Sequence, residues 1–264
     1  MLQVSLARLK QGHRTIPYPA QAPTLPDRFR GLPVVDTSRC PDGCRACAEA
    51  CPTDAISVDA INAGGPDFRL DLGRCLFCTE CAAACPEGAI RYSQEYRLAA
   101  SRREDLVYDG RTPSLAAANE KARRFFGRSL KLRQVSAGGS GACEADLNVL
   151  GTVVFDIGRF GIQFVASPRH ADGLVVTGPV SENTRAALLE TYAAIPAPKL
   201  VIAVGAEAIS GGVFRGQPEV HDGCGSLLPV DLFIPGWPPH PLTILDGLLR
   251  FLGRLQDAPQ RTRT

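Results

Sequence analysis

The sequence contains no long apolar run: no stretch approaches the about 18 uncharged apolar residues that a membrane-spanning helix requires. An excess of charge of one sign is also missing, since 29 Lys and Arg face 27 Asp and Glu and leave a net charge of +2. A dedicated nucleic-acid-binding protein usually carries a large basic excess, so this class is disfavoured. The phosphate-binding patterns GxxxxGK[ST] and GxGxxG do not occur, which leaves nucleotide binding without support.

The amino-terminal residues also lack the long apolar core and the small-residue cleavage site that mark a secretory signal. We therefore expect a cytoplasmic protein. A length of 264 residues corresponds to about two domains.

Cysteine is what the sequence has in excess. There are ten, and all but Cys143 and Cys224 lie between Cys40 and Cys85. Clustered cysteines in a cytoplasmic chain are more often metal ligands than disulfide partners. The sequence therefore predicts metal binding in its amino-terminal half.

The eight clustered cysteines form two similar groups of four. The first group is Cys40, Cys44, Cys47 and Cys51, and the second is Cys75, Cys78, Cys81 and Cys85. The second group has the C-x2-C-x2-C-x3-C-P spacing of bacterial-type ferredoxins, and the first has one extra residue near its start. The sequences that follow also match, CPTDAI against CPEGAI. This internal repeat predicts a small pseudo-symmetric α+β ferredoxin domain of short hairpins and helices.

Two 4Fe–4S clusters are the cofactors that this spacing predicts. In two-cluster ferredoxins the fourth cysteine of each group ligates the other cluster. The expected ligands are Cys40, Cys44, Cys47 and Cys85 for cluster one, and Cys51, Cys75, Cys78 and Cys81 for cluster two. A pair of structural zinc sites is the alternative, because zinc also takes thiolates. Zinc sites do not need the repeated x3-Cys-Pro step.

The extra residue of the first group lies in the segment Pro41-Asp42-Gly43. Glycine tolerates backbone conformations that other residues avoid, so Gly43 can absorb the longer loop. If it does not, cluster one would be a labile or three-iron cluster.

Two further segments flank the cysteine repeat. Residues 11–36 are rich in proline and predict an extended arm that lies on a partner or on the ferredoxin domain. Residues 114–135 predict a helix followed by an irregular link. Its basic residues are Lys121, Arg123, Arg124, Arg128, Lys131 and Arg133. They indicate either contact with an acidic partner or an anionic membrane, or simply a solvated helix face.

From about residue 140 the pattern becomes that of an α/β domain. Short apolar runs at 172–180, 198–205 and 228–236 predict strands, and residues 181–195 predict a helix with Ser181 as its N-cap. Such strands indicate a flavodoxin-like parallel sheet, in which functional groups collect after the carboxyl ends of the strands. Those loops hold Glu207 and Trp237, whereas Cys143 precedes the first clear strand.

Specific stretches resemble known families. LPDRFRGLP, DLGRCLFC and CPEGAI resemble the two-cluster ferredoxin subunit of respiratory complex I and formate hydrogenlyase. RSLKLRQVSAG, PKLVIAVG and PVDLFIPGWPPHP resemble the small subunit of membrane-bound, energy-converting nickel–iron hydrogenases, which is related to the 20 kDa subunit of complex I. The resemblance covers about residues 14–252 and implies a fusion of two subunits that are normally separate.

This resemblance suggests four parts of the chain. They are an extended arm at 1–36, a two-cluster ferredoxin domain at 37–110, a basic linker helix at 111–136 and a small-subunit-like domain at 137–264.

The chain departs from the family where the small subunit holds a further 4Fe–4S cluster on four cysteines. The corresponding positions here are Ser140, Cys143, Glu207 and Trp237. A carboxylate and an indole do not replace two thiolates on iron–sulfur. The resemblance therefore implies that this third, proximal cluster is absent and that Cys143 and Cys224 are inert buried thiols. Trp237 would fill the vacated space rather than form a binding platform. Glu207 would relay protons or anchor an arginine of a partner; alternatively it is a carboxylate paired by an arginine or exposed at an interface.

The expected function is that of a non-catalytic electron-transfer subunit of a hydrogenase-like or complex I-related oxidoreductase. Its partners would be a hydrogenase-like large subunit and membrane-arm subunits, and it would lie on the cytoplasmic face of the membrane without a spanning helix. A structural scaffold with redox-sensing clusters is one alternative. A component of a true hydrogenase or of an NADH-quinone oxidoreductase, using another electron route, is a second.

Overall fold

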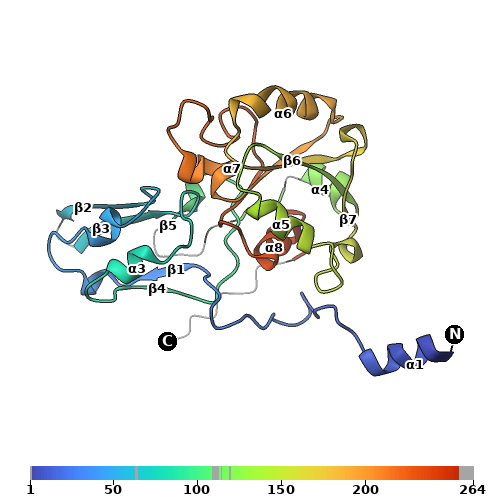
Figure 1. Cartoon of the computed structure of the whole chain (residues 1–264), viewed down its shortest axis with the longest axis horizontal. Helices are drawn as coiled ribbons and strands as arrows, with labels where there is room; N and C mark the ends of the chain where they lie inside the picture. Colours follow the sequence, from blue (N-terminus) through green and yellow to red (C-terminus); the bar gives the residue numbers. More distant parts are fainter. Residues whose placement is uncertain (1, 63–64, 109–112, 114, 119, 256–264) are drawn as a thin grey trace.

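A computed structural model describes residues 2–62, 65–108, 113, 115–118 and 120–255 and contains a small ferredoxin region beside a larger α/β domain (Figure 1). The strands are β1 (Pro33–Val35), β2 (Ile56–Asn62), β3 (Gly65–Asp71), β4 (Ile90–Tyr92), β5 (Val107–Tyr108), β6 (Leu130–Ser136), β7 (Ile162–Phe164), β8 (Gly173–Thr177), β9 (Leu200–Val204) and β10 (Leu232–Ile234). The helices are α1 (Leu2–Gln11), α2 (Ala46–Glu49), α3 (Glu80–Ala84), α4 (Glu120–Phe126), α5 (Ala142–Val149), α6 (Glu182–Ala194), α7 (Ala206–Ser210) and α8 (Pro241–Phe251).

The carboxy-terminal domain is built on a five-stranded parallel sheet in the order β10-β9-β8-β6-β7. In chain order, the second strand lies beside the first at one edge and the third, fourth and fifth follow on its other side, which is the flavodoxin-like order. All residues of β8, β9 and β10 are buried, as the apolar runs predicted. The predicted parallel α/β fold, and helix α6 beginning after Ser181, are therefore confirmed.

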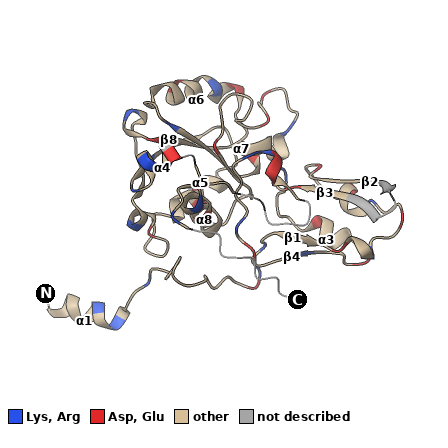
Figure 2. Cartoon of the chain, turned by 180° about the vertical axis from the view of Figure 1, so that it is seen from behind, with Lys and Arg blue, Asp and Glu red and all other residues tan. Residues whose placement is uncertain are grey.

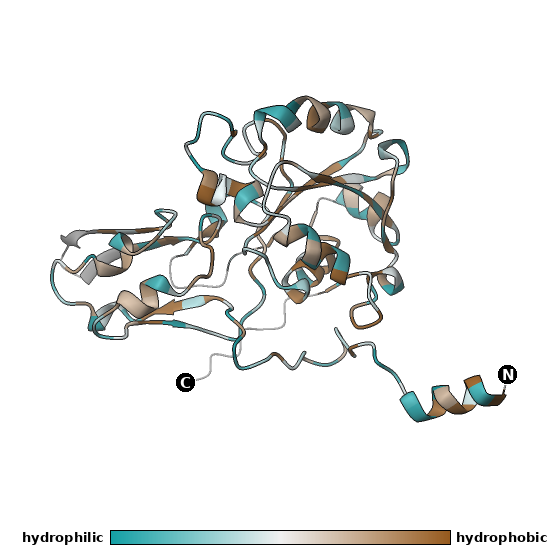
Figure 3. Ribbon diagram, in the orientation of Figure 1, coloured by the Kyte–Doolittle hydropathy of each residue, from teal (hydrophilic) through white to brown (hydrophobic). Residues whose placement is uncertain are grey.

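Alternate residues of the sheet enter two different cores. One face packs against α5 and α8, with Val175, Ile202 and Leu245 in this core. The other face packs against α6 and α7 and continues into the ferredoxin region, where Leu72 and Phe77 join the core residues of the sheet. Figure 3 shows the apolar residues gathered along the central strands and on α8. The two parts of the chain therefore share one hydrophobic core.

The ferredoxin region consists of short elements, as predicted. β1 pairs with β4, β2 pairs with β3, and β5 adds to β3, all antiparallel. The helices α2 and α3, one from each half of the cysteine repeat, contact one another. Elements this short bury little apolar surface of their own, so this region depends on its ligands and on the shared core for stability.

The segment expected as a linker contains a strand that the sequence analysis missed. Among the described residues of this segment, only Glu120–Phe126 is helical. Leu130–Ser136 forms β6, which lies inside the sheet between β7 and β8. Lys131 and Arg133 therefore belong to the strand and do not extend the basic face of the helix. Alternating basic and apolar residues concealed the strand. The sheet therefore begins before residue 137, which was the expected start of the small-subunit-like domain.

The amino-terminal arm is also more structured than predicted. Residues 2–11 form α1, and the following segment contacts the α/β domain rather than the ferredoxin region alone: the amide N–H of Ile16 donates to Val154 O at 2.9 Å. The Tyr18 hydroxyl donates to Oδ1 of the buried Asp246 at 2.8 Å. Further along, the N–H of Leu32 donates to Glu95 O at 2.9 Å, next to β1. None of the helices in the described part of the chain has the length and hydropathy of a membrane span.

Asp246 generates a prediction about pH. Burial raises the pKa of Asp246 to about 6, against the lowering effects of the Tyr18 hydrogen bond and the Arg250 charge, whereas an unfolded Asp titrates near about 4. The folded protein thus binds this proton more tightly. The contribution of Asp246 to stability is therefore fully present below about pH 4 and is lost as pH rises through about 6. Between these pH values Asp246 should lower the free energy of unfolding by up to roughly 3 kcal/mol, and Asp246→Asn should abolish this decrease. Unfolding free energies of both proteins at several pH values measure the effect. Equal slopes for both proteins would contradict the assignment.

Candidate iron–sulfur sites and a remodelled third site

One group of four cysteines lines a single pocket at the end of the ferredoxin region. The thiols are those of Cys40, Cys44, Cys47 and Cys85, and the remaining lining is mainly apolar, including Val35 and Ile90. Burial, followed by the charges of Cys85 and Cys44, raises the pKa of Cys40. The structure thus brings together the four residues that the sequence assigned to cluster one, across a separation of 45 residues.

The other four cysteines lie nearer the α/β domain. Burial raises the pKa of Cys75 to about 12, with further contributions from the charges of Cys81, Cys51 and Cys78. Such mutual influence requires the four thiols to lie close together. Cys75 and Cys81 are buried, and Cys51 and Cys78 are half-buried. The residues assigned to cluster two are therefore neighbours as well.

Backbone amides are directed at the sulfur atoms of both groups. The N–H of Ala55 donates to Cys51 Sγ at 3.2 Å, and the N–H of Ala89 donates to Cys85 Sγ at 3.2 Å. The N–H of Phe77 donates to Cys75 Sγ at 3.3 Å. Such bonds favour the thiolate, which is the form that ligates iron. Four converging thiols with donors to sulfur are a donor set that fits a 4Fe–4S cluster.

The extra residue of the first group is accommodated in a turn. Gly43 has a φ of +73°, a conformation that favours glycine, and a Cβ there would meet no atom within 4 Å. The N–H of Cys44 donates to Pro41 O at 3.1 Å and closes the turn. The inserted residue is therefore absorbed outside the pocket.

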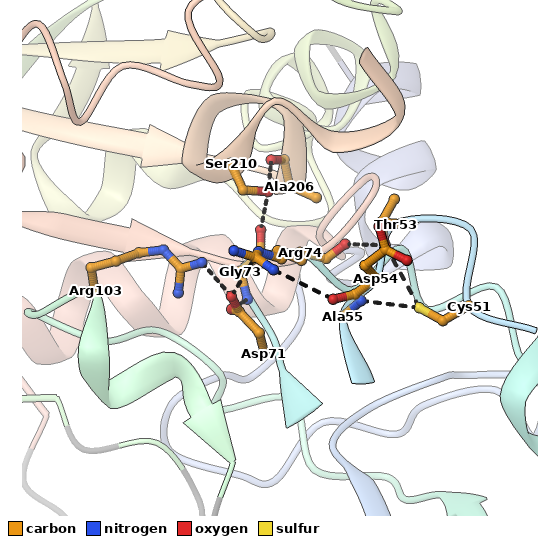
Figure 4. Close-up of polar contacts among 10 residues, drawn as sticks. All are labelled: Cys51, Thr53, Asp54, Ala55, Asp71, Gly73, Arg74, Arg103, Ala206 and Ser210. Carbon is orange, nitrogen blue, oxygen red and sulfur yellow. Dashed lines mark hydrogen bonds and ion pairs between the residues drawn. The ribbon is translucent and has the colours of Figure 1, made fainter. Parts of the chain in front are cut away.

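Helix α7 joins the second cysteine group to the α/β domain (Figure 4). The Ser210 hydroxyl donates to Gly73 O at 2.9 Å, two residues before Cys75. A Cβ on Gly73 would lie 2.8 Å from the Ile209 side chain, so only glycine permits this approach. Asp71 caps the turn by accepting from the N–H of Gly73 at 2.9 Å and from Arg103. No local sequence pattern predicted this junction.

Ser140, Cys143, Glu207 and Trp237 also converge, although they are up to 97 residues apart. Each lies after the carboxyl end of a strand of the parallel sheet. Glu207 follows β9 and Trp237 follows β10, as predicted. Cys143 follows β6, the strand that the sequence analysis missed. One edge of the sheet therefore collects all four positions.

Glu207 occupies the centre of this third site. Its side chain is 1% exposed, and its carboxylate accepts the indole N–H of Trp237 at 2.9 Å. It also accepts the backbone N–H of Ser140, at 3.3 Å to Oε1 and 3.2 Å to Oε2. Among the described residues no Lys or Arg forms an ion pair with Glu207. The expected pairing with an arginine of this chain is therefore wrong for the described part of it, and an indole and an amide take that role.

Cys143 lies beside this carboxylate in a tightly packed position. A Cβ on Gly205 would fall 2.3 Å from Cys143 Sγ, which shows how close the thiol lies to the backbone. Burial raises the pKa of Cys143 far above its usual value, and the charge of Glu207 raises it further. Cys224 is also buried, which raises its pKa to about 12. Burial therefore disfavours the reactive thiolate form of both cysteines.

Trp237, which was expected to fill the vacated space, also borders open space. It is half-buried and lines an open cavity of about 400 Å³ together with Leu76 and Phe77, which lie between Cys75 and Cys78. Phe29 of the amino-terminal arm and His240 line the same cavity and stack edge to face, with ring centroids 5.3 Å apart. Sequence reasoning missed this cavity, because its walls come from five separate parts of the chain.

The comparisons with known proteins divide the chain in the same way. Residues 39–89 match the family described as 4Fe-4S dicluster domain, and this range contains all eight clustered cysteines. Residues 141–251 match the family described as NADH ubiquinone oxidoreductase, 20 Kd subunit. This range contains Cys143, Glu207 and Trp237, and Ser140 directly precedes it.

Similar curated proteins are named as subunits of a hydrogenase, of formate hydrogenlyase and of NADH-quinone oxidoreductase. A protein named as a probable membrane-bound hydrogenase subunit of Pyrococcus furiosus is 39% identical over 132 residues, which cover 50% of this chain and 79% of that protein. Formate hydrogenlyase subunit 7 of Escherichia coli is 38% identical over 54% of this chain and 56% of its own length. A chain of an archaeal respiratory complex, the membrane-bound sulfane sulfur reductase, is 30% identical with a TM-score of 0.45, covering 50% of this chain and 72% of that one.

The hydrogen bond between Trp237 and Glu207 can be tested with a double-mutant cycle. We expect Trp237→Phe to lower the free energy of unfolding by about 1–3 kcal/mol, because a buried carboxylate loses one of its two donors. In a Glu207→Gln background the same substitution should cost about 1 kcal/mol less, since the neutral amide needs the indole less. Chemical unfolding of the four proteins measures this difference. Strictly additive effects would show that the two side chains do not interact.

Proposed function

Since the chain belongs to the family of the 20 kDa subunit of NADH ubiquinone oxidoreductase, we propose that it is an iron–sulfur electron-transfer subunit. Its complex would be a membrane-bound one of the hydrogenase, formate hydrogenlyase and complex I type. A 4Fe–4S dicluster domain precedes the 20 kDa-subunit domain in the chain. The observation that carries the proposal is the convergence of two sets of four thiols next to a family-type α/β domain. One shared core fixes their positions relative to this domain.

The proposed ligands are Cys40, Cys44, Cys47 and Cys85 for one cluster, and Cys51, Cys75, Cys78 and Cys81 for the other. When bound, two such clusters carry single electrons. The chain itself holds the thiols at fixed positions, directs amides at three sulfurs and shields Cys75 and Cys81 from water. All proposed iron ligands are cysteines, so no iron is left open for a substrate, which supports a non-catalytic subunit.

We propose further that the α/β domain holds no third cluster. Three observations support this step. Only Cys143 supplies a thiol at the four converging positions, a carboxylate lies among them, and that carboxylate is already satisfied by two donors inside the protein. Replacing thiolates by a hydrogen-bonded Glu207 converts a soft donor set into one unsuited to iron–sulfur.

The proposed partners follow from the relatives. A hydrogenase-like large subunit would cover the edge of the sheet where Ser140 is exposed and Trp237 half-exposed. Membrane-arm subunits would hold the assembly at the cytoplasmic face of the membrane.

The third site favours one alternative function, in which the α/β domain is only a scaffold and the clusters sense redox state. Rapid reoxidation of the anaerobically reduced protein by its complex, followed by EPR, supports electron transfer; reduced clusters that no subunit of the complex reoxidises support the scaffold.

Iron and acid-labile sulfide assays test the number of clusters. We expect about eight of each per chain in protein purified or reconstituted without oxygen, since each cluster contains four. A value near about twelve would show that the α/β domain holds a third cluster.

Two matched cysteine substitutions test the ligand assignment. We expect Cys78→Ser to remove about half of the iron and to lower the stability of the amino-terminal half, because ligand binding and folding are coupled. Cys143→Ser should leave the iron content unchanged, since this thiol lies in the third site. Loss of iron from the Cys143 variant, or full iron in the Cys78 variant, would contradict the assignment.

A further inference from the structure

Helix α1 presents an apolar stripe that nothing in the described chain covers. The helix has no buried residue and extends away from the body of the protein (Figure 1). Leu2, Leu6 and Leu9 are 76%, 49% and 80% exposed. At 3.6 residues per turn, these three side chains fall within an arc of about 60°. An isolated helix of ten residues is marginal in water, so α1 needs a surface to lie on.

The charge around the stripe is of one sign. Arg8 and Lys10 flank it on opposite sides, about 120° and 80° from its centre by helical geometry. Arg14 follows after the helix, and the first acidic residue of the whole sequence is Asp27. Figure 2 shows the basic residues on α1. Leucines between flanking cations, with no nearby carboxylate, match a surface that is apolar inside and anionic outside.

A second apolar feature lies where the arm meets the body. Val153 is 65% exposed and Val154 is 39% exposed. Their carbonyls accept hydrogen bonds from the arm, Val153 O from the Thr15 hydroxyl at 2.8 Å and Val154 O from the N–H of Ile16 at 2.9 Å. The arm is thus fixed next to exposed apolar side chains just after α1 ends.

From these features we propose that α1 lies in the headgroup region of a membrane containing anionic lipids, with its leucine stripe toward the acyl chains. Cations on both sides of a narrow stripe can contact the headgroups of a membrane at the same time. An acidic groove on a protein partner would need cations on one side of the stripe only. This inference rests on the proposed function, because the membrane in question is that of the proposed complex. It assigns that contact to residues 2–14, and neither the dicluster domain nor the 20 kDa-subunit domain includes them.

The test is co-flotation of the cluster-loaded full-length chain with vesicles of about one part phosphatidylglycerol to two parts phosphatidylcholine. We expect binding to these vesicles and little to pure phosphatidylcholine. Replacing Leu2, Leu6 and Leu9 together by Gln should weaken binding by about 100-fold, because the buried stripe is lost while helix propensity is nearly kept. The pair Arg8→Gln and Lys10→Gln should weaken it by roughly 30-fold.

The matched control is the pair Val4→Gln and Ala7→Gln, which removes apolar groups from the other side of the same helix. It should bind as the parent does. Equal binding to neutral vesicles, an unaffected leucine variant, or an equal loss in the control would overturn the proposal, as would stable docking on a protein partner without vesicle binding. Iron content measured on the same samples separates this outcome from a failure of the proposed electron-transfer function.

Discussion

The close contact between α7 and the turn before Cys75 is the constraint on which the arrangement of this protein depends. Ser210 donates to Gly73 O, and Ile209 packs where any residue larger than glycine at position 73 would collide. This contact merges the ferredoxin region with the core of the parallel sheet. The second cysteine group is thereby fixed beside the same short helix that contains the buried Glu207. A ferredoxin region of such short elements would hold neither its shape nor this position alone.

The third site holds a buried carboxylate with little loss of stability. A buried carboxylate without partners is strongly destabilising. Glu207 avoids this penalty because an indole N–H and a backbone N–H converge on it, from strands that end at the same edge of the sheet. The fold gathers four residues at this edge of the sheet, and a hydrogen-bonded acid lies among them.

Success of the sequence-based predictions followed the strength of the local pattern. The runs at 172–180, 198–205 and 228–236 became β8, β9 and β10, because a strand buried on both faces must be apolar throughout. The cysteine spacing predicted both thiol groups. β6 was missed, because its alternating basic residues resemble an exposed segment, and β7 has only three residues. α1 was missed, because ten residues with an extended proline-rich continuation give little helical signal.

By itself, the sequence determined the ferredoxin repeat and the parallel α/β class, since these depend on spacing and residue type. Only the tertiary structure decided that Glu207 is satisfied by Trp237 and Ser140, that Asp246 anchors the arm through Tyr18, and that Leu76 and Phe77 share a cavity with Trp237. The physical reason is that hydrogen-bond partners and cavity walls come from segments far apart in the chain. Their meeting depends on how the sheet, the short helices and the arm pack around a common core, which no local pattern records.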